Sequence, residues 1–556
     1  MKKLLLIACI VMTQTFTQAQ TIPTANFNVI PLPQRIQTVD GKKFVMNADT
    51  KIVCHDQTAE TKRLATVLAD YIQQQTHFSL GFAELQKKVG KNTIDIVLDP
   101  ALVQIGNETY RMEVRQGNIR ILGSTHQALF RAIQTFRKAL PMTTAAADIT
   151  IPQATIEDTP TMAYRGMHLD CARHFFSVEF VKRYLDIMAL HGMNRFHWHL
   201  TDDQGWRIEI KGYPLLTEIG SKRASTVLGR NSDVQDQQPH GGFYTQQEIK
   251  DIVQYAAERY IEVIPEIDMP GHMLAAMAAY PELGCTSGPY EVGQYWGVYS
   301  DILCAGKDQT YTFVTRVLDE VCSLFPCEYI HIGGDEAPKQ RWQECPLCQE
   351  KIQTLGLQAS KTTPAEEMLQ GYFTTFVQQY LLKKGKRIIG WDELLGCEVD
   401  QSATIMSWRG GNNTLKAARR GHDVIVAPNS NLYFDFYQTA ETWNEPLLIG
   451  GCSTVEDVYN LHLIPDELTP EERRHIVGFQ ANLWSEYIVS EALAEYQVLP
   501  RMAALCELQW NNGRQQPYAD FLVRLNTLRK IYESQGWHYA RHLWPDEHRR
   551  LAKTFG

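Results

Sequence analysis

The sequence lacks several features that mark common classes of protein. Its 556 residues include fewer basic than acidic side chains, 54 against 63, and the net charge of -9 disfavours nucleic acid or an anionic membrane as the main partner. No apolar run beyond residue 20 is long enough to cross a bilayer, so we expect no integral membrane segment in the mature chain. Hydrophobic residues nevertheless make up 44% of the chain, which is enough for large folded cores.

Cysteine motifs are also sparse. Twelve cysteines are present, and eleven remain if Cys9 leaves with an N-terminal signal, so at least one is unpaired or bonds another chain. Cys345 and Cys348 have the CxxC spacing of a metal site, but no second CxxC completes a zinc site. We therefore favour a local disulfide or two free thiols there, and we predict no metal and no cofactor.

The N-terminal segment 1–19 has the pattern of a cleaved secretory signal peptide. Two lysines form a basic start, an apolar stretch follows over residues 4–12, and residues 17–19 offer a cleavage site with small side chains. Cys9 follows Leu-Ile-Ala as in a bacterial lipoprotein box, but the apolar run before it is very short, which disfavours lipidation. We expect export to the periplasm, the cell surface or the medium.

The rest of the chain divides into three regions. Residues 25–157 mix short strands with helix-spaced segments and predict a compact α+β domain. Pro152 and Pro160 mark the junction, after which residues 160–512 form the predicted main domain. Residues 513–556 are charged and carry apolar side chains at helical spacing, which predicts a helical C-terminal extension.

A rhythm of strands and helices runs through the main domain. Short apolar strands alternate with helix-spaced segments, a pattern typical of a (β/α)8 TIM barrel with loop insertions. The eight candidate strands begin near Tyr164, Arg195, Glu262, Tyr329, Arg387, Ala403, Asp423 and His475. A doubly wound sheet is the alternative, but it normally carries a glycine-rich phosphate loop after its first strand, and none is present.

The fourth candidate strand ends in the run His-Ile-Gly-Gly-Asp-Glu, residues 331–336. In a barrel the active site lies at the C-terminal ends of the strands, and glycines there let a ligand approach the backbone. Two adjacent carboxylates in such a place repel each other, so the pKa values of Asp335 and Glu336 separate. One acid and one charged carboxylate are what glycoside hydrolysis requires.

The other candidate strands end in residues suited to a sugar. Carboxylates and arginine bind hydroxyl groups, while tryptophan and tyrosine cover the apolar faces of a sugar ring. The side chains at these ends are Arg173, Asp202, His272, Trp391, Trp408, Tyr433, Asp435, Trp484 and Glu486. His197, His199 and His331 are interpreted as structural histidines, because no carboxylate partner in the sequence completes a metal site.

Five sequence blocks make the chain similar to glycoside hydrolase family 20, the β-N-acetylhexosaminidases. The run at 331–336 fits the signature H-x-G-G-D-E of that family. The other blocks, in order, are YRGMHLDCARHF, FHWHLTDDQGW, IPEIDMPGHM and LWSEY. The resemblance covers residues 25–510 and implies an α+β domain followed by a TIM barrel. It also implies an exo-acting hydrolase that removes terminal non-reducing β-linked GlcNAc or GalNAc from glycans.

The family resemblance assigns a role to each residue. Glu336 would be the general acid and later the base, while the 2-acetamido oxygen of the substrate attacks the anomeric carbon and forms an oxazolinium ion. Asp335 would hold the acetamido N–H, and Tyr433 would hydrogen-bond the acetamido oxygen. Trp391, Trp408 and Trp484 would wall the acetamido pocket, Arg173, Glu486 and Asp435 would bind ring hydroxyls, and Asp202 with His272 would support Glu336.

Other functions stay open at this point. A lacto-N-biosidase-like enzyme would release a disaccharide, and the loops at the rim decide whether a second sugar fits. A non-catalytic sugar-binding protein is disfavoured by the intact Asp335–Glu336 pair. A metal hydrolase is the remote alternative. The natural glycan and the oligomeric state have no signal in the sequence.

Overall fold

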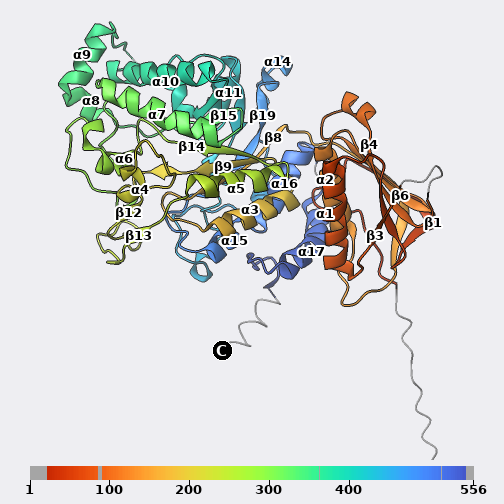
Figure 1. Cartoon of the computed structure of the whole chain (residues 1–556). Helices are drawn as coiled ribbons and strands as arrows, with labels where there is room; N and C mark the ends of the chain where they lie inside the picture. Colours follow the sequence, from red (N-terminus) through yellow and green to blue (C-terminus); the bar gives the residue numbers. More distant parts are fainter. Residues whose placement is uncertain (1–21, 85–89, 362, 515, 546–556) are drawn as a thin grey trace, which may run out of the picture.

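A computed structural model describes residues 22–84, 90–361, 363–514 and 516–545 of the chain. The predicted signal peptide and Cys9 lie outside the described residues. Two folded units follow each other along the chain, a smaller sheet domain and a larger barrel domain (Figure 1). No helix in the described segments is long and apolar enough to cross a membrane.

The first unit is a seven-stranded mixed sheet in the order β1-β7-β5-β6-β4-β2-β3. Its strands are β1 (Arg35–Met46), β2 (Lys51–Cys54), β3 (Gly81–Ala83), β4 (Thr93–Leu98), β5 (Tyr110–Val114), β6 (Asn118–Gly123) and β7 (Ile149–Asp158). Helices α1 (Ala59–Thr76) and α2 (His126–Ala139) cover the face of the sheet that is turned toward the barrel domain (Figure 1). A threonine caps the N-terminus of each helix, Thr58 for α1 and Thr125 for α2.

The second unit is a closed parallel barrel, which confirms the predicted fold class. Its strands, in barrel order, are β8 (Tyr164–Asp170), β9 (Arg195–His199), β14 (Glu262–Glu266), β15 (Tyr329–His331), β16 (Arg387–Trp391), β17 (Thr404–Ser407), β18 (Val424–Val426) and β19 (Ile476–Ala481). Each begins within one residue of its predicted start. All seven residues of β8 are buried, as expected for a strand covered on both faces.

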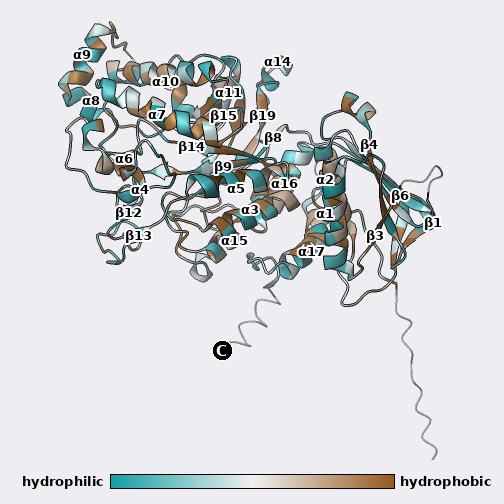
Figure 2. Cartoon of the chain, in the orientation of Figure 1, coloured by the Kyte–Doolittle hydropathy of each residue, from teal (hydrophilic) through white to brown (hydrophobic). Residues whose placement is uncertain are grey.

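Helices pack around the outside of the barrel, and many carry hydrophobic residues on one side and hydrophilic residues on the other (Figure 2). In α5 (Gln246–Ala257), for example, Ile249, Ile252 and Ala256 are buried, at the spacing of one helical face. Thr245 and Glu248 form a capping box that fixes where this helix begins. The other helices are α3 (Val178–Leu190), α4 (Leu215–Glu218), α6 (Leu274–Ala279), α7 (Asp308–Leu324), α8 (Gln340–Glu344), α9 (Pro346–Thr354), α10 (Ala365–Lys383), α11 (Gly411–Arg419), α12 (Asn429–Leu432), α13 (Val455–Tyr459), α14 (Pro470–Arg473), α15 (Glu491–Val498), α16 (Arg501–Asn511) and α17 (Tyr518–Ser534).

Short elements lie within the loops between these helices and strands. The 3-10 helices are η1 (Pro100–Gln104), η2 (Pro281–Leu283), η3 (Asp392–Gly396) and η4 (Thr442–Asn444). The remaining strands form two small hairpins, β10 (Thr201–Asp202) with β11 (Gly205–Trp206) and β12 (Lys222–Arg223) with β13 (His240–Gly241).

Polar contacts join the two units and the C-terminal helix. The Lys138 ammonium at the end of α2 donates to the Leu190 carbonyl at the end of α3, over 3.1 Å. The Trp510 indole of α16 donates to both oxygens of Asp158 at the end of β7, each over 3.1 Å. Helix α17 lies beside α2 (Figure 1), and its Tyr532 hydroxyl lies 2.7 Å from the His191 imidazole. The sheet domain therefore supports the side of the barrel.

Candidate active site

The turn after β15 is shaped by two glycines that have no room for side chains. Gly333 and Gly334 have φ values of 63° and 96°, which favour glycine. A Cβ on Gly333 would lie 1.7 Å from Asp268 Oδ1, and one on Gly334 would lie 2.4 Å from Leu394 Cδ1. The Gly334 N–H donates to Asp268 Oδ1 over 3.1 Å. This close approach turns the chain so that the next residues project over the barrel mouth.

The two carboxylates of the motif have different surroundings. The Asp335 side chain is only 14% exposed, whereas that of Glu336 is 41% exposed. Burial raises the pKa of Asp335, and the nearby Glu266 and Glu336 charges act in the same direction, while His272 opposes them. Asp335 Oδ1 is buried and has no hydrogen-bond partner among the described residues. Oδ1 is therefore a buried oxygen that could still accept a hydrogen bond.

Asp268, which follows β14, lies directly against Asp335. Burial and the charge of Asp335 raise the pKa of Asp268 well above its usual range. Asp268 is 1% exposed and is the deeper of the two, so burial disfavours its charged form more strongly. An oxygen of each carboxyl group lies within 4.8 Å of an oxygen of the other.

His272 lies between two acidic pairs, Asp202 with Asp203 and Asp335 with Glu336. Its Nδ1 lies 3.1 Å from Asp202 Oδ1 and 3.1 Å from Asp203 Oδ2, and its Nε2 lies 3.6 Å from Glu336 Oε2 and 3.7 Å from Asp335 Oδ2. Burial lowers the pKa of His272, but the Asp202, Asp203 and Glu336 carboxylates together outweigh burial and hold the pKa well above its usual range. His272 is therefore an imidazolium between four carboxylates. The structure brings Asp202 and His272 together beside Glu336, and their supporting role stays a prediction.

Arg173 forms the far side of the charged network. Its Nη2 lies 2.8 Å from Asp202 Oδ2, its Nη1 lies 3.3 Å from Asp170 Oδ2, and its Nε donates to Gln204 Oε1 over 3.0 Å. Burial opposes the charge, yet Asp202, Glu486 and Asp170 hold the pKa of Arg173 well above its usual range. The guanidinium also lies 5.1 Å from the centroid of the Trp484 ring. Arg173 and Glu486 thus share one side of the site.

Aromatic side chains form a slot beside the carboxylates. Trp408 and Tyr433 stack with ring centroids 6.2 Å apart, and Trp484 lies 6.2 Å from Tyr433 and 5.8 Å from Trp391. Trp408 and Trp484 are half-buried, whereas Trp391 is 1% exposed and closes the bottom of the slot. Burial raises the pKa of the Tyr433 hydroxyl well above its usual range, and the charges of Asp335 and Glu393 act in the same direction.

Asp435 follows Tyr433 on the same loop. A backbone hydrogen bond from the Phe434 N–H to the Asn482 carbonyl, 2.7 Å long, holds this loop against the chain beyond β19. Asp435 is 4% exposed, and its Oδ1 has no partner among the described side chains and backbone groups. Burial and the Glu486 charge raise the pKa of Asp435 well above its usual range. Asp335 and Asp435 thus each carry one buried oxygen without a hydrogen-bond partner among the described residues.

The strand histidines belong to the barrel interior. Glu266, at the end of β14, lies 2.9 Å from His197 Nε2, 2.5 Å from His199 Nδ1 and 2.9 Å from His331 Nδ1. Its other contact is the Trp391 indole, which donates to Oε1 over 2.9 Å. Glu266 thus contacts all three histidines and anchors the tryptophan at the bottom of the slot, while His331 Nε2 has no hydrogen-bond partner among the described residues.

Sequence reasoning did not assign a role to four acidic residues of the site, Asp203, Glu266, Asp268 and Glu393. Burial and the Asp335 charge raise the pKa of Glu393 to about 8, and its carboxyl accepts from the Trp408 indole over 3.1 Å. All four stand at or just beyond strand ends, inside or beside the blocks that the sequence shows. Their position was the only signal that the sequence held for them.

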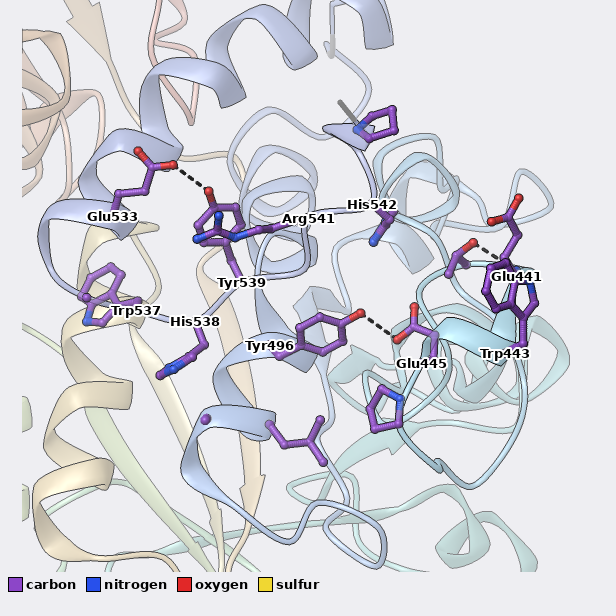
Figure 3. Close-up of a pocket in the computed structure, with 16 residues that line it drawn as sticks. Glu441, Trp443, Glu445, Tyr496, Glu533, Trp537, His538, Tyr539, Arg541 and His542 are labelled. Atoms are coloured by element: carbon purple, nitrogen blue, oxygen red, sulfur yellow. Dashed lines mark hydrogen bonds between the residues drawn. The ribbon is translucent and has the colours of Figure 1, made fainter. Parts of the chain in front are cut away.

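A groove of about 590 Å³ opens beside Glu336 and is lined by Gly334, Lys339, Glu393 and Arg409 among others. A larger hollow of about 1060 Å³ lies elsewhere, between the loop around Trp443, α15 and the segment after α17 (Figure 3). None of the predicted site residues lines that larger hollow. The carboxylates and the aromatic slot therefore define the candidate active site.

Comparisons with known proteins agree with this geometry. Residues 162–513 match the catalytic domain of glycosyl hydrolase family 20, and residues 26–159 match domain 2 of the same family. The chain is 42% identical to a β-hexosaminidase of Porphyromonas gingivalis over 92% of its own length, but it spans only 64% of that relative. It is 35% identical to a β-hexosaminidase of Vibrio furnissii, over 89% of the chain and 79% of the relative.

Solved structures lead to the same family. The β-N-acetylhexosaminidase of Bacteroides fragilis superposes with a TM-score of 0.76 at 32% identity, over 92% of this chain and 96% of that one. An exo β-N-acetylglucosaminidase of Vibrio harveyi, solved with N-acetylglucosamine, gives a TM-score of 0.79 at 31% identity over 93% and 79%. With its barrel, its preceding sheet domain and its Gly-Gly-Asp-Glu turn, the chain belongs to glycosyl hydrolase family 20.

Proposed function

We propose that the chain is an exo-acting β-N-acetylhexosaminidase that hydrolyses terminal non-reducing β-linked GlcNAc or GalNAc with retention of configuration. The observation that carries the proposal is the unpartnered Asp335 Oδ1 beside a slot of tryptophan and tyrosine. An acetamido group needs an apolar slot, one acceptor for its N–H and one donor for its oxygen. Asp335 supplies the acceptor, and the Tyr433 hydroxyl supplies the donor.

In the proposed mechanism the substrate provides the nucleophile. The acetamido oxygen, held by Tyr433, attacks the anomeric carbon as Glu336 protonates the leaving oxygen, and an oxazolinium ion forms. Asp335 accepts a hydrogen bond from the acetamido N–H and stabilises the positive charge that develops on the ring. Glu336 then takes a proton from a water molecule. The oxygen of that water attacks the anomeric carbon and opens the oxazolinium ring. Because the nucleophile is fixed next to the anomeric carbon, the reaction has the entropic advantage of an intramolecular step.

The charged network would prepare the site for these steps. His272 lies within 3.7 Å of both Asp335 and Glu336, so one cation serves two carboxylates with different tasks. Arg173, Glu486 and Asp435 would bind ring hydroxyls away from the scissile bond. Buried polar groups of this kind favour the sugar strongly, because a ligand without the hydroxyls would leave them unpaired.

One set of assays tests the activity and the mechanism. The p-nitrophenyl β-glycosides of GlcNAc and GalNAc should be hydrolysed, whereas the β-glucoside, which lacks the acetamido group, should not. A thiazoline analogue of the oxazolinium ring should inhibit competitively, and the first sugar released should be the β-anomer by NMR. Equal turnover of the β-glucoside would contradict substrate assistance. Release of a disaccharide from a defined glycan would favour the lacto-N-biosidase alternative.

A further inference from the structure

Four cysteine sulfurs meet at one point of the barrel domain, away from the aromatic slot. Cys345 and Cys348 are joined there by Cys285 and Cys304, and their four Sγ atoms all lie within 4.8 Å of one another. The cluster is formed by the loop between η2 and α7 and by the start of α9. In Figure 1, α8 and α9 lie at the edge of the barrel domain that is remote from the sheet domain. We propose that these four cysteines form a structural zinc site.

The distances between the sulfurs fit a tetrahedral metal site. Cys304 Sγ lies 3.6 Å from Cys348 Sγ and 3.7 Å from Cys345 Sγ, and Cys285 Sγ lies 3.9 Å from Cys348 Sγ. With a Zn–S bond of about 2.3 Å, the edges of a zinc tetrahedron are about 3.8 Å. A disulfide would instead bring two sulfurs to about 2.05 Å. None of the cysteines in the described segments forms a disulfide, so of the two sequence alternatives for Cys345 and Cys348, a local disulfide or two free thiols, the disulfide is absent.

The backbone around the sulfurs is built for close approach. A Cβ on Gly306 would lie 2.3 Å from the carbonyl carbon of Leu347 and 2.5 Å from the Cys348 nitrogen. Only glycine lets the chain after Cys304 press against the turn between Cys345 and Cys348. Two ligands from one CxxC turn and two from a facing loop are a common arrangement in structural zinc sites.

The surroundings exclude water from most of the cluster. Cys304 and Cys348 are fully buried and Cys345 is 5% exposed, among Ile302 and Trp342, which are also buried. Only Cys285 is half-buried and reaches the surface. Four protein ligands with no open position define a structural rather than a catalytic zinc. Softer sulfur ligands select zinc or iron over magnesium and calcium, and the closed tetrahedron of thiolates suits zinc.

A metal also explains how a long irregular loop keeps its shape. The chain from 284 to 307 contains neither helix nor strand, and loops of that length without regular structure are uncommon. Lys307 Nζ donates to the Glu282 and Gly284 carbonyls over 2.8 and 2.6 Å, which holds the base of the loop. Four metal bonds would fasten its two cysteines to α9.

The cluster is mechanically connected to the active site at two places. The Leu303 N–H donates to the Pro270 carbonyl over 3.0 Å, two residues before His272. Ala337, which follows Glu336, packs against the cluster of side chains around the sulfurs. We therefore expect loss of zinc to loosen the rim around both residues, with a larger effect on stability than on turnover.

Metal analysis of the full chain tests the proposal. The protein is purified without a histidine tag, chelator or reductant, and its metals are measured by plasma mass spectrometry. We expect about one zinc per chain, as one closed tetrahedral site requires. Cys348→Ser and Cys285→Ser should each lose most of it, while Cys452→Ser, an exposed cysteine outside the cluster, should keep it. Co²⁺ added to the zinc-free chain should give the thiolate charge-transfer bands of tetrahedral cobalt.

Thiol labelling distinguishes the competing states. In denaturant with EDTA and no reductant, a zinc site leaves all four cysteines open to alkylation. Four labelled thiols without zinc in the native protein would mean plain buried cysteines, and label that appears only after reduction would mean disulfides. Either result, or iron in place of zinc, overturns the proposal. If Cys348→Ser fails to fold, two measurements still decide whether the cluster binds zinc. They are the zinc content of Cys285→Ser, whose side chain lies at the surface, and the zinc content of the unaltered chain.

Discussion

The imidazole of His272 lies 3.6 Å from the Glu336 carboxylate, with its other nitrogen 3.1 Å from Asp202. The nearby His272 cation lowers the pKa of Glu336, against the effect of burial. Loss of that positive charge should therefore raise the pKa of Glu336.

Removing the imidazole should change the pH dependence of hydrolysis. In the unaltered protein, kcat/KM should fall on the alkaline side as Glu336 loses its proton, at a pKa that His272 holds low. In His272→Asn the pKa of Glu336 should rise, so the alkaline limb should move to higher pH. At pH 7 we expect kcat/KM to fall at least about tenfold, because a buried charged partner is lost.

The measurement is a pH profile of kcat/KM with a β-GlcNAc glycoside. His462→Asn serves as the control, since His462 has a 68% exposed side chain and pairs only with the surface residue Asp466. An alkaline limb at the same pH in both variants would show that His272 does not control the proton on Glu336.

The role of Glu336 as general acid predicts a dependence on the leaving group. Glu336→Gln should lower kcat/KM by about 10²–10⁴-fold for a natural glycan, whose leaving oxygen needs a proton. Dinitrophenolate leaves without protonation, so the loss should be much smaller for the dinitrophenyl glycoside. Glu328→Gln, a change at the opposite end of β15 where the side chain is 53% exposed, should leave both rates near normal. Equal losses on the two substrates would argue against the acid role.

The barrel could be predicted from the sequence because the residue types change where its strands end. The strands beginning at Tyr164, Arg195 and Glu262 each run from apolar residues into a block of carboxylates, histidines and aromatics, and the polar change marks the rim. The same blocks identified Asp335 and Glu336. These signals are local, so a single chain segment is enough to read them.

Features that depend on contacts between distant segments had no such signal. Asp268 and Asp335 lie close together because β14 and β15 are neighbours in the barrel, and neither segment alone shows that this contact raises the pKa of Asp268. Cys285 and Cys304 lie 63 and 41 residues from their partners Cys348 and Cys345. The sequence pattern showed only the pair Cys345 and Cys348. The other two cysteines of the cluster became apparent only from the folded structure.

Gly333 lies so close to the Asp268 carboxyl that a side chain at position 333 would clash with it. The effect of this clash can be measured separately from the strain of a positive φ. Gly333→Ala forces a Cβ into the Asp268 carboxyl and should lower both the free energy of unfolding and kcat/KM. Gly356→Ala is a matched control, because Gly356 has φ 65° against 63° at Gly333 but open space around a Cβ. The control should cost about 1–2 kcal/mol, the price of a left-handed alanine, with kcat/KM unchanged. Denaturant unfolding and kinetics on both variants measure the difference, and equal costs would contradict the packing argument.

The Tyr433 hydroxyl provides the most direct test of the acetamido slot. Tyr433→Phe keeps the ring against Trp408 and Trp484 and removes only the donor to the acetamido oxygen. Loss of one donor to a developing charge typically costs about 10²–10³-fold in kcat, so we expect a fall of that order with a smaller change in KM. Affinity for the thiazoline inhibitor should fall in parallel with kcat/KM, because both depend on the same hydrogen bond. Tyr380→Phe, which loses a 2.6 Å hydrogen bond to Asp319 on the outer helices, should change neither. A Tyr433→Phe enzyme with unchanged kcat, or one in which only KM rises, would place the hydroxyl outside the reacting geometry and leave the acetamido oxygen to another donor.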